Sequence, residues 1–548
     1  MKTLLLYLCL PLLTLVFTNC SPKVEKSQLV QEKILNYPVL KGKEDNPLLR
    51  IAIEGQLQDE TKLSAIGIDL GSVSAKQFKN FRVYYTGQDS AFSKAVQYGK
   101  SVDPKQQTTI KGQQELQPGL NYFWLAGELM EDANLDAFIT VNLDFVEVEA
   151  KRLKPIFQED KPLRMGVAVR QHGDDQVHTY RIPGLATSKQ GTLLAIYDVR
   201  RESGRDLQGN MDIGLSRSID GGNTWEPMQI VLDMKTWGGL PEKYNGVSDA
   251  CILVDQYSDA IYIAGLWMHG VIDSKGQWLE GLNENSNAWN HQWRNKGSQP
   301  GIGVKQTSQF LLTKSTDNGL SWSKAVNLTA MCKKPEWWLW APAPGHGITL
   351  QDGTLVFPTQ GRDINGHTFS NITYSKNGGE TWKTSKAAGT NTTESMAVQL
   401  SDGSLMLNMR DNRNRQEKGI KNGRAIATTY DLGENWQVHP TSNGALIESV
   451  CMASIHKHEY TDANGQKKSL LLFSNPNSKY QRHKQTLKVS FDDGQTWPEK
   501  YWIELDEGSG AGYSCLTSIN ENTIGILYEG SQAQMTFQRI SLSEIMKH

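Results

Sequence analysis

Three polar stretches of the chain carry side chains that could bind a charged ligand and move protons. Residues 201–210 (RESGRDLQGN) supply carboxylates, which can donate or accept a proton during a reaction. Residues 479–484 (KYQRHK) are basic and suit an anion. Residues 507–516 (EGSGAGYSCL) place Tyr513 after closely spaced glycines, which let the backbone approach a ligand. A phenol has a pKa of about 10, so Tyr513 would need a neighbouring base in order to react.

Several classes of function are disfavoured by what the sequence lacks. The glycine-rich stretch does not spell GxGxxG, and no HExxH, EF-hand or Walker pattern occurs, so we expect no cofactor, metal or nucleotide. Lys plus Arg is 57 and Asp plus Glu is 59, and this net charge of −2 gives no basic field for nucleic acid. The 49 glycines and 15 tryptophans among 548 residues are typical of many short strands joined by tight turns.

An eight-residue pattern that occurs five times must organise the elements that position these side chains. In each copy Ser or Thr is followed after two positions by Asp or Asn, after two more by Gly, and after three more by Trp. The copies are residues 218–225, 315–322, 375–382, 429–436 and 490–497. The carboxylate can accept bonds from the N–H groups of its own turn, Gly tolerates a positive φ, and the Trp packs back as an apolar plug. Each copy is therefore predicted to close a β-hairpin.

The spacing of the copies predicts an array of small sheets. From Trp to Trp the distances are 97, 60, 54 and 61 residues. A period of this size with one long insertion indicates sheets that repeat around or along an axis, as in propellers. The excess of the long repeat lies in residues 268–305, which we interpret as a long loop that either contacts substrate or is a structural insertion.

The repeated pattern resembles the Asp-box of sialidases. This resemblance implies an all-β fold in which residues 165–548 form a six-bladed β-propeller. Asp-boxes are structural and lie away from the active site, so on their own they indicate a fold and not a function.

Further motifs resemble those that contain the active-site residues of sialidases. Residues 180–183 (YRIP) are similar to the Arg-Ile-Pro motif that opens the family's propeller. Residues 391–411 resemble its Glu-bearing strand, and residues 512–514 (GYS) its nucleophile loop. By this resemblance Arg181, Arg410 and Arg482 bind the carboxylate of a sialic acid. Arg200 is an additional arginine near the catalytic acid, and Asp249 contacts the sugar hydroxyls.

The same resemblance assigns the catalytic groups. A carboxylate nucleophile would be repelled by the carboxylate of the substrate, and sialidases use a tyrosine instead. Tyr513 is then the nucleophile, Glu394 the base beside it, and Asp206 the acid and base that acts on the leaving oxygen and on water. Glu202 and Asp212 compete with Asp206 for that last role. Trp337, Trp338 and Trp340 either wall the pocket or belong to the core.

The activity implied is that of an exo-α-sialidase, which releases terminal sialic acid from glycoproteins, glycolipids and oligosaccharides with retention of configuration. Trans-sialidases and intramolecular trans-sialidases share these residues and stay open as alternatives. A non-catalytic sialoglycan-binding propeller is a further alternative, which should lack Tyr513 or Glu394. The expected partner is a sialylated glycan, and the sequence indicates no nucleic acid and no obligate protein partner.

The first 150 residues predict export and an accessory domain. Residues 1–20 read as a signal peptide, and Cys20 at the end of the apolar run resembles a lipoprotein box, so the protein is expected in the periplasm, at the outer membrane or cell surface, or secreted. Any membrane contact would come through a lipid on Cys20. Residues 21–45 are expected to be a linker. Residues 46–150 predict a small β-sandwich with either a glycan-binding or a spacer role. The remaining cysteines are far apart and are expected to be buried and unpaired; they are Cys251, Cys332, Cys451 and Cys515.

Overall fold

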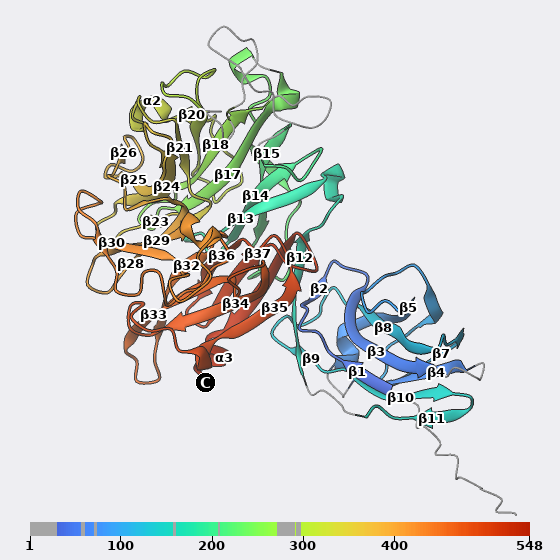
Figure 1. The fold of residues 1–548 in the computed structure, drawn as a ribbon. Coiled ribbons are helices and arrows are strands. Elements are labelled where there is room, and N and C mark those ends of the chain that lie inside the picture. Colours follow the sequence, from blue (N-terminus) through green and yellow to red (C-terminus); the bar gives the residue numbers. More distant parts are fainter. Residues whose placement is uncertain are drawn as a thin grey trace, which may run out of the picture.

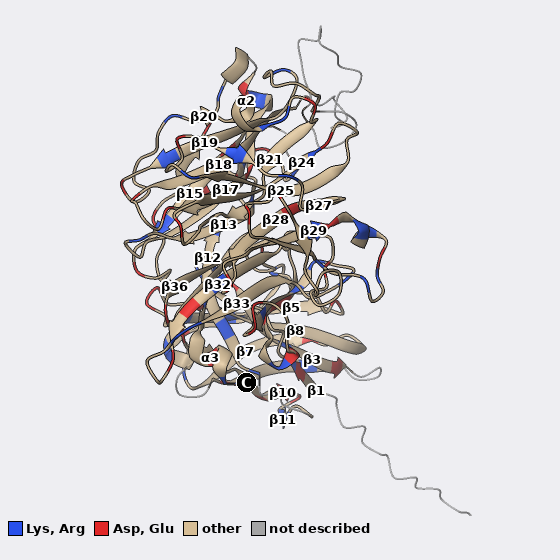
Figure 2. Cartoon of the chain, turned by 90° about the vertical axis from the view of Figure 1, so that its left-hand side faces the viewer, with Lys and Arg blue, Asp and Glu red and all other residues tan. Residues whose placement is uncertain are grey.

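The computed structural model describes residues 30–55, 61–70, 74–156, 161–206, 209–239, 241–270, 291 and 298–547. These residues form a smaller N-terminal β domain and a larger β domain that holds the rest of the chain (Figure 1). The expected signal peptide and most of the loop expected at 268–305 lie outside the described residues. Lys, Arg, Asp and Glu are interspersed over the ribbon without a large region of one sign (Figure 2), as the net charge of −2 leads one to expect.

The N-terminal domain consists of two antiparallel sheets packed on a common core. One sheet has the order β1-β3-β8-β5-β6 and the other β11-β10-β4-β7. The strands are β1 (Val30–Lys33), β3 (Asn46–Gly55), β4 (Lys62–Asp69), β5 (Phe78–Gly87), β6 (Gln97–Val102), β7 (Gln107–Glu115), β8 (Gly119–Leu129), β10 (Asn142–Val148) and β11 (Lys151–Leu153), with the 3₁₀ turn η1 (Ala75–Gln77). Buried residues such as Phe81, Phe123 and Val146 alternate with exposed ones, which is the pattern of a sandwich.

Residues 21–45 do more than link, which corrects the expectation from the sequence. Within them β1 pairs antiparallel with β3 of the N-terminal domain. The next strand, β2 (Val39–Lys41), instead pairs parallel with β12 (Leu163–Arg170) of the larger domain. The polar composition of this segment hid both strands, because an edge strand takes its stability from the sheet that it joins.

The larger domain is built from four-stranded antiparallel units. The strands in each unit follow the chain, apart from the unit that contains both β12 and the C-terminal strands. Two of the units are continuous as one sheet, because β15 and β17 pair in parallel at Met211 and Gly246. The units are β12 with β36 (Ser514–Asn520), β37 (Thr523–Tyr528) and β38 (Met535–Ser541); β13 (Thr179–Thr187), β14 (Leu193–Arg200), β15 (Met211–Ser218) and β16 (Gln229–Leu232); β17 (Asn245–Val254), β18 (Ile261–His269), β19 (Gln309–Ser315) and β20 (Val326–Asn327); β21 (Leu339–Pro342), β24 (Leu355–Arg362), β25 (Thr368–Ser375) and β26 (Lys383–Thr384); β28 (Thr392–Gln399), β29 (Leu405–Asp411), β30 (Ala425–Thr429) and β31 (Gln437–Val438); and β32 (Ser454–Thr461), β33 (Lys467–Pro476), β34 (His483–Ser490) and β35 (Ile503–Ser509).

Short elements complete the fold. They are β9 (Phe138–Ile139), β22 (Gly345–His346), β23 (Ile348–Thr349), β27 (Gly389–Thr390), α2 (Thr329–Cys332), α3 (Leu542–Met546), η2 (Asp174–Gln176), η3 (Trp237–Gly239), η4 (Glu242–Tyr244), η5 (Asn412–Arg415) and η6 (Glu499–Tyr501). No helix in the described part of the chain is long and apolar enough to cross a membrane. The four cysteines expected to be free are buried and unpaired.

The first strands of the units pack against one another around the middle of the domain. β13 contacts β36 on one side and β17 on the other, and β28 and β32 continue the series to β36. These strands are almost wholly buried, because each has neighbours on both faces. Several begin with a bulge, at Arg181/Gly184 in β13, at Ser248/Cys251 in β17 and at Thr392/Ser395 in β28. A bulge re-aims the side chains beside it, and these bulges adjoin the predicted site residues.

All five copies of the repeated pattern form the predicted hairpin, and each joins the third and fourth strands of its unit. In the first copy the Ser218 hydroxyl donates to Asp220 at 2.8 Å and accepts from the N–H of Gly222 at 2.8 Å, while Asp220 accepts from the N–H of Thr224 at 3.0 Å. The other copies repeat these three bonds. The pattern is therefore a self-contained turn, and its own hydrogen bonds determine which residue types occur at its key positions.

Candidate active site

Tyr513, Glu394 and Arg410 form the centre of the candidate site. The Tyr513 hydroxyl donates to Oε1 of Glu394, while Nη1 of Arg410 lies 2.5 Å from Oε2 of Glu394 and 3.0 Å from the Tyr513 oxygen. Glu394 comes from the bulged start of β28 and Arg410 from the end of β29, whereas Tyr513 immediately precedes β36. The hairpin β28–β29 and the start of β36 thus bring a phenol, a base and a cation together.

Burial and charge keep the Tyr513 phenol neutral. Its side chain is 6% exposed, and desolvation followed by the negative charge of Glu394 raises the pKa of Tyr513 well above 10. Arg410 and Arg482 act in the opposite direction but do not outweigh these effects. The phenol cannot ionise spontaneously at neutral pH, so any attack by its oxygen requires transfer of the proton, and Glu394 is the acceptor in contact.

Arg181 and Arg482 both lie close to the same phenol ring. Their guanidinium carbons are 5.4 and 5.5 Å from the centroid of the Tyr513 ring. Arg482 donates to the carbonyl of Ala511 at 2.9 Å and to the carbonyl of Val450 at 3.2 Å. Three predicted arginines therefore surround one tyrosine, although they are separated by up to about three hundred residues in the sequence.

Glu529, which the sequence analysis missed, fixes two of these side chains. Its Oε1 accepts from Nε of Arg181 and, at 2.9 Å, from the N–H of Ile182, and its Oε2 accepts from the N–H of Tyr513 at 2.9 Å. Ile182 has a φ of 61°, which is strained for a β-branched residue, and the bond to Glu529 helps to hold it there. No local motif marks Glu529, because its partners lie far away in the sequence.

Asp206, the predicted acid, is held by Arg200, which also forms a buried ion pair with Asp198. Arg200 is fully buried and donates to Asp198 at 2.9 Å and to Asp206 at 2.6 Å. The Asp206 side chain remains 69% exposed. The competing Asp212 is buried and bound to Arg201, and Asp206, not Asp212 or Glu202, lines the candidate cavity. Asp198 was also missed by the sequence analysis.

Asp249 completes a cluster of acids. It is buried at the bulge of β17 with a φ of 53°, and its N–H donates to Asp198 at 3.2 Å. Desolvation, with the charges of Asp198, Glu394 and Asp206, raises the pKa of Asp249 well above its usual value. The raised pKa favours the protonated form of Asp249, which as a carboxylic acid can both donate and accept a hydrogen bond.

These groups open into one cavity of about 210 Å³. Asp206, Asp249, Glu394, Arg410 and Tyr513 line it, together with residues of the unit that contains β24 and β25. Those residues are Gln360, Arg362 and Thr368. Nε of Arg410 and the hydroxyl of Thr393 are buried without a hydrogen-bond partner among the described residues. Unpartnered buried polar groups in a cavity suit a polar ligand.

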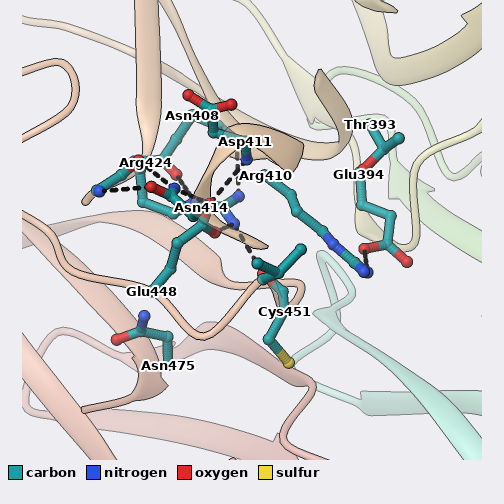
Figure 3. A network of polar contacts seen from close by, with 12 residues as sticks. Thr393, Glu394, Asn408, Arg410, Asp411, Asn414, Arg424, Glu448, Cys451 and Asn475 are labelled. Carbon is teal, nitrogen blue, oxygen red and sulfur yellow. Dashed lines mark hydrogen bonds and ion pairs between the residues drawn. The ribbon is translucent and has the colours of Figure 1, made fainter. Parts of the chain in front are cut away.

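A buried network lies behind two of the arginines (Figure 3). Arg424 and Glu448 are both fully buried and paired at 2.6 Å. Glu448 accepts from the N–H of Asp411 at 2.7 Å, next to Arg410, and Arg424 donates to the carbonyl of Cys451 at 2.8 Å, next to the carbonyl that binds Arg482. This pair therefore fixes the backbone that carries Arg410 and the backbone that holds Arg482. No local motif in the sequence marks this pair.

Seven of the eight predicted site residues lie around Tyr513 or along the cavity that it lines. Arg200 is the exception, because it is fully buried and reaches the cavity only through its ion pair with Asp206. Trp340 is fully buried in the core against Phe310. Trp337 belongs to the same core and also lines a second cavity. No group of three or more His, Cys, Asp or Glu suited to a metal ion occurs within the residues described.

Several known proteins are similar to most of this chain. A sialidase of Bacteroides fragilis is 38% identical to the chain and covers 97% of it and 98% of itself. A sialidase of Micromonospora viridifaciens is 29% identical, over 68% of this chain and 53% of its own. The solved structure of the Hadza microbial sialidase Hz136 is similar with a TM-score of 0.83 at 35% identity, covering 94% of this chain and 99% of that one.

Family models divide the chain as its fold does. The N-terminal domain of BNR-repeat neuraminidase matches residues 26–152, and a BNR repeat-like domain matches residues 182–523, which is more than half of the chain. The first match includes β1 and the sandwich, and the second includes all five repeated hairpins and Tyr513. The chain belongs to the BNR-repeat neuraminidase family.

Proposed function

We propose that the protein is an exo-α-sialidase that hydrolyses terminal sialic acids of glycoconjugates with retention of configuration. The observation that carries the proposal is the set of three arginines around a phenol that is hydrogen-bonded to a carboxylate. The relatives that match nearly the whole chain are named sialidases. A site built around an anion-binding arginine cluster fits a sugar whose anomeric carbon bears a carboxylate.

Arg181, Arg410 and Arg482 bind the substrate carboxylate. Guanidiniums are permanently charged and present planar pairs of donors. Nε of Arg410, buried and without a partner among the described residues, gains one when the anion binds. The anomeric carbon next to this carboxylate is then held close to the Tyr513 oxygen. Asp249 lines the cavity, where it can contact hydroxyl groups of the ring, and the buried Arg200 holds Asp206 beside it.

The reaction proceeds in two displacements. The Tyr513 oxygen attacks the anomeric carbon while its proton passes to Glu394, and Asp206 gives a proton to the leaving oxygen as the glycosidic bond breaks. Water, deprotonated by Asp206, then attacks the anomeric carbon of the tyrosyl intermediate, and the phenol oxygen recovers a proton from Glu394. Two inversions give retention. Trans-sialidases and intramolecular trans-sialidases share the first displacement and differ in the acceptor, so identifying the product of sialyllactose separates the three activities.

The larger domain is a six-bladed propeller in this proposal, with each four-stranded unit as one blade. The antiparallel pairing within each unit and the contacts between successive innermost strands support it. The first and last parts of the chain would close the ring, since β12 pairs with β38. The protein is exported, as the apolar segment at the N-terminus indicates.

Replacing Tyr513 by Phe tests the proposal. The variant lacks the nucleophilic oxygen but keeps the buried ring, so we expect turnover of 3′-sialyllactose to fall by roughly a thousandfold or more with little change in melting temperature. Tyr480→Phe is the matched control, because Tyr480 is 72% exposed on the loop that carries Arg482. Near-normal activity of the Tyr513 variant would refute the mechanism.

A further inference from the structure

Two neighbouring segments beside the candidate active site carry an excess of positive charge. Residues 412–422 follow β29 and hold four Lys or Arg residues against a single acid, Glu417. Residues 477–484 lead from β33 into β34 and hold three more, with no acid. The whole chain has 57 basic and 59 acidic residues, so this excess is local. We call the two segments together the basic rim.

The two halves of the basic rim brace each other through lysine side chains. Nζ of Lys418 donates to the carbonyl of Lys479 at 2.7 Å and to the carbonyl of Asn414 at 2.6 Å. In return, Nζ of Lys479 donates to the carbonyl of Gly419 at 2.6 Å. Lys418 also lies 5.8 Å from the centroid of the Tyr480 ring. The basic rim is therefore one connected surface, although its halves belong to different units of the larger domain.

Most of the charge of the basic rim is uncompensated. Arg413 pairs with the buried Asp411 at 2.9 Å, and Glu417 accepts from the N–H of Gly419 at 2.6 Å. None of the four lysines of the rim forms an ion pair among the described residues. These lysines are Lys418, Lys421, Lys479 and Lys484. The braces between the two halves end on neutral carbonyls, so an anion that approaches this surface meets several positive charges at once.

The basic rim continues into the candidate active site. Arg415 and Asn412, in its first half, line the same cavity as Tyr513. Arg482, in its second half, has its guanidinium carbon 5.5 Å from the centroid of the Tyr513 ring. Lys421, in contrast, is exposed on the surface of the molecule. Positive charge therefore extends from the arginine cluster around the phenol to the solvent-exposed surface.

We propose that the basic rim captures glycans that carry several sialic acids, by attracting the carboxylates of those that are not in the cavity. This inference rests on the proposed function and adds a preference for multiply charged substrates. An ammonium group is a point charge on a flexible stem, so lysines can meet carboxylates that have no fixed position along a glycan. A sialylated glycan suits the rim better than another polyanion does, because Arg482 belongs both to the rim and to the arginine cluster that binds the substrate carboxylate.

A synthetic polymer that carries many 3′-sialyllactose groups tests the proposal against free 3′-sialyllactose. The two substrates share the linkage and the leaving group and differ in charge. We expect kcat/KM per sialic acid to be roughly fivefold or more higher for the polymer at about 0.01 M salt, where charges act over about 30 Å. At about 1 M salt, where this range falls to about 3 Å, the two values should converge. Equal values at low salt would overturn the inference.

Reversing two exposed charges of the basic rim supplies the second part of the test. Lys421→Glu combined with Lys484→Glu leaves the braces intact and should lower kcat/KM for the polymer by roughly fivefold or more at low salt, with less than about a twofold effect on free 3′-sialyllactose. Lys324→Glu with Lys383→Glu is the matched control, because both lysines are exposed, do not line the candidate cavity and give the same change in net charge. An equal loss in the control pair, or equal losses on both substrates in the rim pair, would contradict the inference.

Binding without turnover separates the failure of this inference from the failure of the proposed function. The Tyr513→Phe variant should bind the fluorescently labelled polymer at low salt, and adding the two rim substitutions should raise Kd by roughly fivefold or more. No hydrolysis of free 3′-sialyllactose by the intact enzyme, with this difference in Kd retained, would overturn the proposed function alone. Tighter binding of an oligonucleotide of equal charge than of the polymer would assign the basic rim to nucleic acid and overturn the inference.

Discussion

The carboxyl group of Asp206 is subject to opposing influences. Burial raises its pKa, but Arg200 and Arg181 outweigh this effect and hold the pKa of Asp206 below its usual value in the empty site. An ionised carboxylate cannot protonate a leaving group. Binding of the substrate carboxylate to the arginines would offset their positive charge and raise the pKa of Asp206, so the acid becomes competent when it is needed.

Asp206→Ala should therefore show a loss that depends on the leaving group. We expect kcat/KM for 3′-sialyllactose to fall by roughly 10²- to 10⁴-fold, and far less for a 4-nitrophenyl sialoside, whose leaving group departs without a proton. Steady-state kinetics with both substrates measure this difference. Glu202→Ala, in the same polar loop, is the control and should leave both rates unchanged. Equal losses on the two substrates would show that Asp206 does not act as the acid.

Asp249 lowers the stability of the fold at neutral pH although the proposed function needs it in the site. Because its pKa is raised in the folded protein, the folded state binds a proton that the unfolded state has lost, and stability falls as pH rises above about 4, the pKa of an unfolded aspartate. Asp249→Asn keeps the shape without this proton. We expect a higher melting temperature than the parent at pH 7 and a difference that shrinks toward pH 4, by calorimetry.

The same substitution should weaken substrate binding, because an amide cannot replace a carboxylic acid in the bonds that it makes with sugar hydroxyls. Raised KM together with raised stability would separate the site role from a structural one. Asp103→Asn is a suitable control, since Asp103 is exposed in the loop between β6 and β7. A melting temperature for the Asp249 variant below that of the parent at pH 7 would contradict the protonated state described here.

At the scale of elements, the site is built where inner strands begin and where the network behind them fixes their ends. Bulges at β13, β17 and β28 turn side chains toward the middle of the domain. The buried pair Arg424–Glu448 ties the end of β29 to the loop before β32. Neither residue lines the candidate cavity, so both are positioning residues in this arrangement.

Glu448→Gln should raise KM more than it lowers kcat. Loss of the charge leaves Arg424 buried and uncompensated, at a cost of about 3 kcal/mol in stability, and allows the backbones next to Arg410 and Arg482 to shift. Inhibition constants for a carboxylate-bearing sialic acid analogue should rise in parallel with KM. A purely structural role would lower the melting temperature without changing these constants. Glu434→Gln is the control, since its pair with Lys386 is 60–65% exposed on both sides.

At the scale of the whole molecule, the two domains share structure rather than being joined by a loose linker. A continuous core includes Val39 and Leu48 together with Val167 and Phe537. β2 pairs with β12, and Arg539 forms an ion pair with Asp136 at 2.6 Å. The N-terminal domain therefore covers apolar surface of the larger domain, in addition to any glycan that it binds.

A chain that begins at residue 161 should be less stable but chemically competent. It lacks β2 and exposes the part of the core around Val167 and Phe537, so we expect a lower melting temperature and a tendency to aggregate. Its kcat on a small sialoside should stay close to that of the full chain, because no described residue before 161 lines the candidate cavity. An unchanged melting temperature would show that the domains are energetically independent.

The sequence by itself determined the repeated hairpins and the types of residue that perform the chemistry. Each hairpin is held by hydrogen bonds between residues two to four positions apart, so its residue pattern can be recognised from the local sequence alone. Only the tertiary structure decided that Glu529 fixes Arg181 and Tyr513, that Asp206 rather than Asp212 lines the cavity, and that β2 belongs to the larger domain. These features depend on partners up to several hundred residues away, and a buried carboxylate with distant partners leaves no periodicity or local motif in the chain.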